Sequence, residues 1–275
     1  MRELRIYALI ATIFMIAIIA FFSLPLLWLF VSAFNPYATP SLEIPTNPSL
    51  RNFVELFRPV GMVYPYQWIL NSIIVSSASA TIATIISFLS AFVFARFPFR
   101  GQEAMLSLFV VLRLIPPIII ALPIMVLYRM WGLINTLHGL ILVLSAFVLP
   151  FTLLILESSL RAIPTTYEEA AMLDGCTKLG AFLRVTLPLA APSIVTAWLL
   201  AFVTVWSEFV ITLMIIRDPS LMTASIGLRF FFGEYGRVEY GKLSAFSILY
   251  SVPIIAVFFA IQKYLRRGIA GLVTR

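Results

Sequence analysis

The chain lacks most of the residues from which soluble enzymes build reactive sites. Only 11% of its 275 residues are charged, and it contains one cysteine and one histidine. Soluble domains carry about 25% charged residues. Cys176 has no cysteine to pair with, and together with His138 it cannot supply the ligand set of a transition-metal site. These shortages exclude a disulfide scaffold and a cysteine–histidine metal centre.

The common catalytic and nucleotide-binding motifs are also missing from the sequence. A P-loop needs two glycines followed by lysine and by a serine or threonine whose hydroxyl holds magnesium. The nearest stretch begins at Gly236 and ends with Gly241-Lys242-Leu243, and leucine has no hydroxyl. The sequence contains no H-E-x-x-H motif and no serine elbow near His138. We therefore expect no enzymatic activity, no metal and no cofactor in this chain.

The sequence is instead rich in long hydrophobic runs. Hydrophobic residues make up 61% of the chain, and the mean hydropathy is +1.04. A helix of about 20 apolar residues, rising about 1.5 Å per residue, crosses a hydrocarbon core of ~30 Å. Six runs are predicted to span a membrane: residues 6–34, 68–95, 104–130, 139–160, 193–216 and 244–261. The sequence therefore predicts an all-α polytopic membrane protein with six transmembrane helices.

The distribution of Lys and Arg indicates how the spans are oriented. Cytoplasmic flanks of spanning helices are enriched in these residues. If the N-terminus lies inside, the inner segments hold more of them than the outer segments, and we therefore predict that both termini are cytoplasmic. The net charge of +7 then follows from topology, since no basic stripe on a soluble module indicates nucleic-acid binding.

The first run also has some features of a secretion signal. A basic start precedes it, and Val31-Ser32-Ala33 loosely resembles a cleavage site. The apolar core of a signal usually has about 7–15 residues, far fewer than residues 6–34. We interpret this run as a retained span. On this topology Cys176 lies on the reducing side of the membrane, where a small buried residue is its simplest role.

The loops divide the chain into parts. Residues 35–67 are rich in proline, which prevents a long helix and is typical of an extended outer loop with a short helix near residues 50–57. Two other loops are long, and loops carry function more often than the helices that hold them. The predicted parts are the N-terminal span 1–34, the outer loop 35–67, a five-helix core 68–266 with an inner loop 161–192 and an outer loop 217–243, and a cytoplasmic tail 267–275.

The inner loop is unusual because it combines charges with small apolar residues. Thr165 with Glu168, and Thr166 with Glu169, both fit the capping box that begins a helix. Negative charge in the first turn is favoured by the helix dipole. Gly175 is suited to the left-handed residue that ends such a helix. The sequence therefore predicts a short helix of about nine residues after Pro164.

A second short helix is predicted to follow. Thr177 can cap its N-terminus, and one face carries Leu179, Phe182 and Leu183 at helical spacing. Pro188 then marks the entry to the fifth span. We call residues 165–187 the knob; its alanine-rich surface suits a groove in a partner protein. The alternative is an amphipathic hairpin on the membrane surface, although an acidic first turn fits poorly with anionic lipid.

Ionisable residues inside predicted spans are costly and indicate cavities, partner contacts or pathways. Arg113 precedes Pro116 and Pro117, which remove two backbone donors near the middle of the third span. A broken helix beside a guanidinium suits a polar pathway, whereas an ion pair with Glu157 or with a second chain would serve packing alone. Trp206 and Glu208 in the fifth span allow the same two interpretations.

The knob also carries a specific motif. Glu169-Ala170-Ala171, then Gly175, Val185 and Leu187-Pro188, closely resembles the E-A-A-x3-G-x9-I-x-L-P loop of importer-type ABC permeases, with valine replacing the usual isoleucine. Further stretches look like the carbohydrate-uptake subfamily, in particular its second, six-span, maltose-type subunit. They are Asn71-Ser72, Arg113-Leu-Ile-Pro-Pro, Trp131-Gly-Leu-Ile-Asn-Thr, Trp206-Ser-Glu-Phe and Arg267-Gly-Ile-Ala-Gly.

The resemblance implies a function and a set of partners. It implies the permease subunit of a binding-protein-dependent importer of a sugar or oligosaccharide in a prokaryotic cell membrane. The partners would be a homologous second permease, two ATP-binding subunits that hold ATP and magnesium, an external solute-binding protein and membrane lipid. The residues implied to dock on the ATPase are Glu168, Glu169, Ala170, Ala171, Asp174, Gly175, Leu187 and Pro188, with Glu169 facing a basic residue. For Glu168 and Asp174 the alternative is that they only cap and end the helix.

The resemblance also points to the outer loop. In maltose-type relatives the corresponding loop reaches towards the sugar, so a set of residues is implied to contact the binding protein or released substrate. They are Phe230, Phe231, Phe232, Gly233, Glu234, Tyr235 and Tyr240. The alternative is aromatic anchoring at the membrane interface. Ser207 replaces the family's usual asparagine, and the tail after Arg267 is about one residue short of the family pattern, so substrate identity and the tail's ATPase contact stay open.

Two other classes of function were weighed against this resemblance. A secondary transporter or channel working without ATP would carry coupling acids at mid-membrane and often an internal repeat, and the sequence shows neither clearly. A purely structural membrane subunit would leave the spacing of the knob motif unexplained.

Overall fold

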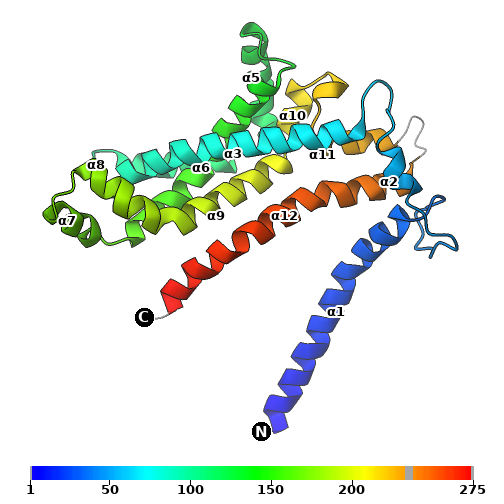
Figure 1. The fold of residues 1–275 in the computed structure, drawn as a ribbon, viewed down its shortest axis with the longest axis horizontal. Coiled ribbons are helices and arrows are strands. Elements are labelled where there is room, and N and C mark those ends of the chain that lie inside the picture. Colours follow the sequence, from blue (N-terminus) through cyan, green and yellow to red (C-terminus); the bar gives the residue numbers. More distant parts are fainter. Residues whose placement is uncertain (1, 233–237, 274–275) are drawn as a thin grey trace. The chain divides into compact units, whose positions relative to one another are not determined.

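The structure, a computed structural model, describes the backbone of residues 2–232 and 238–273, and the side chains of residues 7, 10–232 and 238–262. Within these residues every regular element is a helix, apart from one isolated bridge between Val60 and Val63 (Figure 1). The predicted all-α class is confirmed.

The described residues contain five single helices that are long and apolar enough to cross a membrane, and one bent pair that completes six spans. The prediction of six transmembrane segments is thus confirmed, while the orientation of the termini stays a prediction. The spans are α1 (Arg2–Ala33), α3 (Pro65–Arg96), α4 (Gln102–Leu114) with α5 (Pro117–Met130), α6 (Leu137–Ala162), α8 to α9 (Lys178–Trp206) and α12 (Tyr240–Val273).

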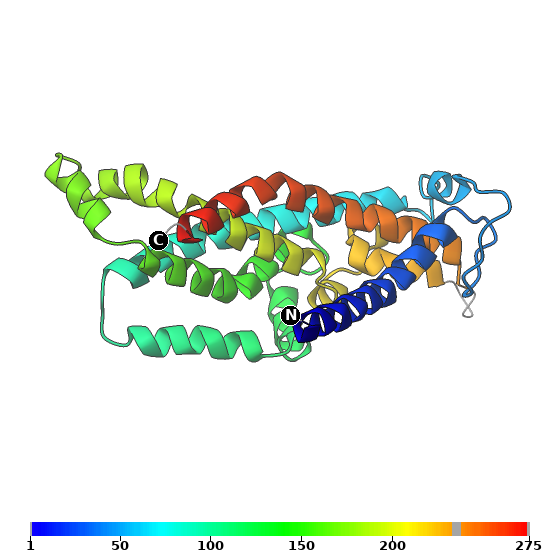
Figure 2. The same cartoon turned by 90° about the horizontal axis from the view of Figure 1, so that it is seen from below.

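The third span is broken where the double proline predicted a break. Helix α4 ends at Leu114, Ile115 is extended, and Pro117 is the first residue of α5. Proline cannot donate a backbone hydrogen bond, and it forces the preceding residue out of the helical conformation. As a result, α5 turns away from α4 by 96° (Figure 2).

The chain divides into two compact units. One comprises residues 1–66 and 227–252, and the other comprises residues 67–226 and 253–275. In the second unit α3, α6 and α9 (Leu187–Trp206) run side by side, with α7 (Thr166–Leu173) and α8 (Lys178–Ala181) at one end of them (Figure 1). This unit contains the knob.

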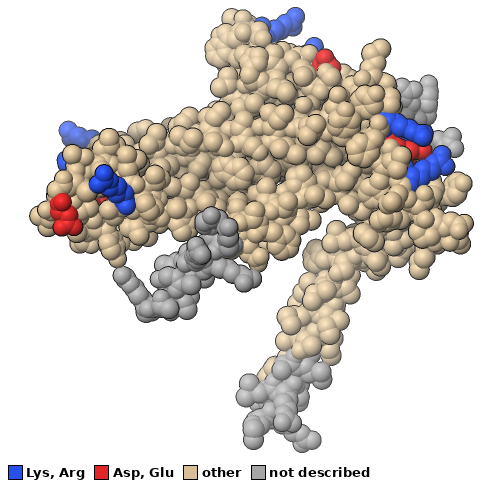
Figure 3. Space-filling view, viewed as in Figure 1, with Lys and Arg blue, Asp and Glu red and all other residues tan. Residues whose placement is uncertain are grey.

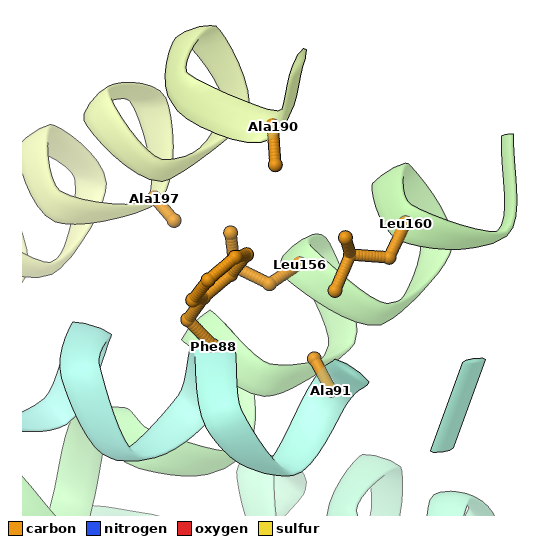
Figure 4. Close-up of a cluster of buried hydrophobic side chains, with 6 residues drawn as sticks. All are labelled: Phe88, Ala91, Leu156, Leu160, Ala190 and Ala197. Carbon is orange, nitrogen blue, oxygen red and sulfur yellow. The ribbon is translucent and has the colours of Figure 1, made fainter. Parts of the chain in front are cut away.

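Small side chains allow α3, α6 and α9 to approach closely. Phe88 and Leu156 point towards each other, and alanines of α3 and α9 surround them (Figure 4). Small residues and interhelical hydrogen bonds are typical of helix packing in membranes. The Ser87 hydroxyl on α3 lies 2.5 Å from that of Thr152 on α6. The cluster consists of Phe88, Ala91, Leu156, Leu160, Ala190 and Ala197.

The predicted bounds of the fifth span, residues 193–216, are wrong at both ends. The helix begins at Lys178 and continues through one π-helical turn, Phe182–Thr186, into α9, which ends at Trp206. Ser207 and Glu208 interrupt it, and α10 (Val210–Ile215) is a separate helix. Hydropathy could not show this break, because residues 209–216 are as apolar as the span.

The remaining helices are short. The predicted helix near residues 50–57 is confirmed as α2 (Arg51–Glu55). The described part of the outer loop 217–243 contains the helical pieces η2 (Pro219–Leu221), α11 (Ala224–Gly227) and η3 (Leu228–Phe232).

Within the first unit, polar contacts bind α2 to the end of α1 and to the start of α12. The amide of Asn52 donates to the carbonyls of Ala33 and Asn35, at 3.0 and 2.9 Å. The Glu55 carboxylate lies 3.0 Å from Arg51 Nε and 3.0 Å from Lys242 Nζ. The hydrogen bond from Arg51, followed by that from Lys242, lowers the pKa of Glu55 from its usual 4.5.

The lowered pKa of Glu55 predicts a pH-dependent contribution to stability. Because the folded-state pKa lies below the unfolded value, the ionised carboxylate stabilises the fold at neutral pH, and this stability is lost as the pH falls through the folded pKa. We expect Glu55→Gln to lower the thermal midpoint of the detergent-solubilised protein at pH 7, and the difference from wild type to shrink as the pH falls below 4.5 and to vanish below the folded-state pKa. Glu103→Gln serves as the control, and a difference that persists at low pH would contradict the assignment.

Candidate functional site

The first helix of the knob ends as its glycine predicts. Helix α7 runs from Thr166 to Leu173, and Gly175 follows with φ +92°. This left-handed conformation is disfavoured for residues with a Cβ atom. Thr177 then accepts a hydrogen bond from the Gly180 amide at 3.1 Å and caps α8. The prediction of two short helices joined at Gly175 and Thr177 is therefore correct.

The predicted capping boxes do not form. Thr165 has a helical conformation, and its side chain makes no capping hydrogen bond. The Glu168 carboxylate does not reach back to the helix start, because it is bound to side chains of two other elements. The N-terminus of α7 is thus positioned by tertiary contacts and not by its own sequence.

Glu168 lies at the centre of a partly buried polar network. Its Oε1 accepts hydrogen bonds from Arg96 Nε and from the Thr186 hydroxyl, both at 2.8 Å. The Arg96 side chain is only 6% exposed, and it also donates to the carbonyls of Leu160 at 3.1 Å and Ile163 at 2.9 Å. These carbonyls belong to the end of α6, which has no helical partners for them. The Arg96–Glu168–Thr186 network therefore joins α3, α6, α7 and the π-helical turn.

Sequence reasoning missed this network. In the sequence Arg96 is one of the positive charges that indicate the inner side of the membrane, and Thr186 belongs to no predicted site. A signal was present, since an arginine at the last residue of a span precedes a very short loop. Pairing it with Glu168, 72 positions away, required the fold.

Pro188 explains the π-helical turn that precedes α9. Proline has no backbone N–H for an α-helical hydrogen bond, and its ring crowds the preceding turn. Residues 182–186 form a wider turn, in which the Leu187 N–H donates to the Phe182 carbonyl. The Phe182 ring stacks on Phe88 of the helical core at a centroid distance of 5.6 Å. The Leu-Pro pair of the motif thus sets the geometry at which α8 enters α9.

The opposite face of the knob is open. Glu169 and Ala170 are exposed, and the Leu173 side chain is 89% exposed. Charged side chains gather over α7 and α8, whereas the visible face along α3, α6 and α9 carries few (Figure 3). Acidic and apolar side chains are therefore both accessible on α7.

The other predicted docking residues are divided between this open face and the interior. Asp174, Gly175 and Pro188 are exposed, Ala171 is half-buried, and Leu187 packs against the helical core. The expected apolar face of the second helix is only partly formed, because Phe182 points inward while Leu179 and Leu183 are 66% and 50% exposed.

The residues proposed for a pathway are not brought together. The Arg113 guanidinium lies 3.6 Å from the centroid of the Phe151 ring, a cation–π contact. In the part of the chain that the structure describes, no ion pair links Arg113 to Glu157 or Glu208, and Glu157 pairs with Arg161 on its own helix. The suggested Arg113–Glu157 pair is therefore wrong, while Pro116 and Pro117 form the break described above.

Glu208 caps a helix. Its carboxylate accepts hydrogen bonds from the backbone N–H of Ile211 at 2.7 Å, the N–H of Thr212 at 3.0 Å and the Thr212 hydroxyl at 2.9 Å. It is 8% exposed, and it sits at the N-terminus of α10 where the helix dipole favours an anion. Trp206, also buried, stacks on Phe202 at 5.6 Å. The geometry thus favours a packing role for both residues.

Two asparagines hold the segment that follows α10. The Asn71 amide donates to the carbonyls of Ser220 and Met222, at 2.9 and 3.0 Å. The Asn135 side chain, on a residue with φ 62°, accepts from the N–H groups of Arg217 and Asp218 at 3.0 and 2.8 Å. The Asn71-Ser72 and Trp131-to-Thr136 stretches therefore position the outer loop.

The outer-loop residues have different environments. Phe231 is buried against Phe246 at 5.2 Å, so its role is packing, whereas Phe232 is 50% exposed. Phe230 and Tyr240 are half-buried, and the Tyr240 ring lies edge-on to Trp28. Gly233, Glu234 and Tyr235 lie outside the described residues. Contact of this loop with substrate or a binding protein stays a prediction.

Comparison with known proteins identifies relatives along the whole chain. Residues 83–271 match the family described as "Binding-protein-dependent transport system inner membrane component". The probable ABC transporter permease protein YurM of Bacillus subtilis is 34% identical over 90% of this chain and 82% of its own. The trehalose/maltose transport system permease protein MalG of Thermococcus litoralis is 30% identical over 97% of this chain and 95% of its own.

A solved structure has the same fold. A chain of a bacterial ABC transporter involved in the import of the acidic polysaccharide alginate superposes with a TM-score of 0.80, covering 96% of this chain and 98% of that chain at 17% identity. The predicted importer-type permease fold is confirmed.

The left-handed Gly175 predicts a graded response to substitution. A Cβ atom there meets nothing within 4 Å, so only backbone strain opposes it. We expect Gly175→Asn to be tolerated, Gly175→Ala to destabilise the end of α7 by about 1 kcal/mol, and Gly175→Val to cost more. Hydrogen exchange of the amides of residues 170–176 measures this order, and equal exchange in all variants would contradict it.

The capping contacts of Glu208 predict that its substitution lowers the stability of the folded protein. Glu208→Ala leaves two buried N–H groups without acceptors, and we expect it to destabilise the protein by about 2 kcal/mol. Glu208→Gln keeps one acceptor oxygen and should cost less. Thermal unfolding in detergent distinguishes the variants, and a wild-type midpoint in Glu208→Ala would disprove the capping role.

Proposed function

The chain belongs to the family of inner membrane components of binding-protein-dependent transport systems, and from this premise we propose that it forms half of the pathway of an ATP-driven importer for a sugar or oligosaccharide. It is a membrane-spanning permease subunit of an ABC importer. The alternative, an ATP-independent transporter or channel, conflicts with this family membership.

The sugar substrate is supported by the names of relatives. The Thermococcus litoralis relative is named for trehalose and maltose, and the structural relative for an acidic polysaccharide. The family's description names a binding protein, which we propose delivers the substrate from outside the cell. We propose that a homologous second permease supplies the other half of the pathway, and that the chain lies in a prokaryotic cell membrane with both termini in the cytoplasm.

The knob is proposed to dock on the ATPase. The observation that carries this proposal is the exposure of Glu169, Ala170 and Leu173 on α7. Alanine lets a partner approach closely, leucine supplies apolar contact area, and Glu169 can pair with a basic side chain. ATP and magnesium are proposed to bind the two ATPase subunits, since the sequence of this chain has no P-loop.

Docking through α7 predicts which variants lose the ATPase. We expect Glu169→Lys to reduce the amount of ATPase that co-purifies with the tagged permease by about tenfold or more, because it reverses an interfacial charge. Gly175→Pro should have a similar effect, since it disrupts the end of the helix. The ratio of ATPase to permease in the purified complex is the measurement.

Glu103→Lys provides a matched control. Glu103 is an exposed glutamate in the first turn of α4, outside the knob, and its reversal should leave co-purification unchanged. Retention of the ATPase and of sugar uptake by both knob variants would refute docking through α7.

A further inference from the structure

The two adjacent glutamates of α7 border the same cavity but have different partners and exposure. Glu169 is exposed, whereas the Glu168 side chain is 14% exposed and bound to Arg96 and Thr186. We propose that Glu168, Arg96 and Thr186 are positioning residues that couple movement of α7 to the spanning helices, and that Glu168 does not dock on the ATPase. This inference rests on the proposed function of the knob.

A cavity between α3, α7 and α8 limits the direct packing of α7 on α3. A space of about 560 Å³ separates α3 from α7 and α8, with mainly apolar walls that include Phe92, Met172 and Leu179. Arg96 and Glu168 line the same cavity. Because side-chain packing does not fill this space, the ion pair is a direct link between α3 and α7. Its low-polarity surroundings strengthen the attraction between the two charges.

Two short backbone connections join α7 to its neighbours. Helix α7 packs chiefly against α8 and the π-helical turn. It follows α6 through the short stretch 163–165, and it leads into α8 through the left-handed Gly175. Without side-chain contacts, α7 could rotate about these two joints when a partner pulls it.

The network removes this freedom. Arg96 fixes Glu168 to the end of α3 and to the last carbonyls of α6. Thr186, which is fully buried, fixes the same carboxylate to the turn that leads into α9. A displacement of α7 is therefore carried to three spanning helices at once. Coupling between sites requires such an element with defined alternative positions.

The decisive experiment separates ATPase binding from coupling. The reconstituted importer carries Cys176→Ser, and a reporter cysteine replaces the exposed Ser207. The rate at which an impermeant maleimide labels this cysteine is measured with and without ATP. EDTA is added with the ATP, so that the nucleotide binds without being hydrolysed. Glu168→Gln is compared with its neighbour Glu169→Gln. Both changes remove one charge and keep the shape of the side chain.

We expect the two variants to fail in different ways. Glu168→Gln should keep the ATPase bound, while the nucleotide-induced change in labelling falls about fivefold or more. Glu169→Gln should lose ATPase from the complex, and the complexes that remain should keep the change in labelling. The inference is overturned if Glu168→Gln loses the ATPase as Glu169→Gln does, or if it keeps the full change in labelling.

A double-mutant cycle tests whether the residues act as one contact. If Arg96 and Glu168 act only through each other, Arg96→Gln with Glu168→Gln should lose no more coupling than the worse single variant. Additive losses would show separate roles and overturn the network. The Thr186→Val variant, which keeps the size of the side chain, offers a milder version that still folds if Arg96→Gln does not.

The outcomes also distinguish this inference from the proposed function. If no ATPase co-purifies with the wild-type permease, the proposed function fails. If the ATPase binds and the wild-type reporter responds to ATP, the proposed function stands, and the Glu168→Gln result alone decides the role of the network.

Discussion

The arrangement of the knob depends on one partly buried ion pair. Arg96 and Glu168 are expensive to remove from water, and a pair of this kind is stable only when its remaining hydrogen-bonding groups are also satisfied. Here the guanidinium completes the end of α6 and the carboxylate accepts the Thr186 hydroxyl. Loss of one partner would leave a largely desolvated charge unpaired, so the network holds α7 in one orientation while Glu169 stays exposed.

Prolines determine where the helices of the second unit are interrupted. Pro116 and Pro117 break the third span and turn α5 away from α4 by 96°. Pro188 has no backbone N–H to donate to an α-helical hydrogen bond, and the residues before it form a wider, π-helical turn that leads into α9. π-helical turns are rare and are often found at functional sites. In this chain the turn carries Thr186, so the wide turn and the network occupy the same place.

Much of the architecture could be predicted from local signals. Hydropathy predicts the six spans, the double proline predicts the broken third span, and Gly175 and Thr177 predict the two short helices of the knob. The errors have a common physical cause, since the sequence shows local preferences and not distant partners. The capping boxes fit locally, yet Glu168 binds Arg96. The fifth span was bounded by hydropathy, yet the helix ends at Trp206 and the apolar residues 210–215 form a separate helix.

If the network couples α7 to the spanning helices, α7 moves together with them. In the Cys176→Ser importer, spin labels are attached to cysteines that replace Tyr167 on α7 and Phe97 directly after α3. Pulsed electron paramagnetic resonance then measures the distance between these two labels. We predict the same distance distribution with and without ATP plus EDTA, while the Ser207 reporter confirms that the pathway has changed state. A nucleotide-dependent shift of the α7–α3 distance beyond the width of the distribution would contradict the claim.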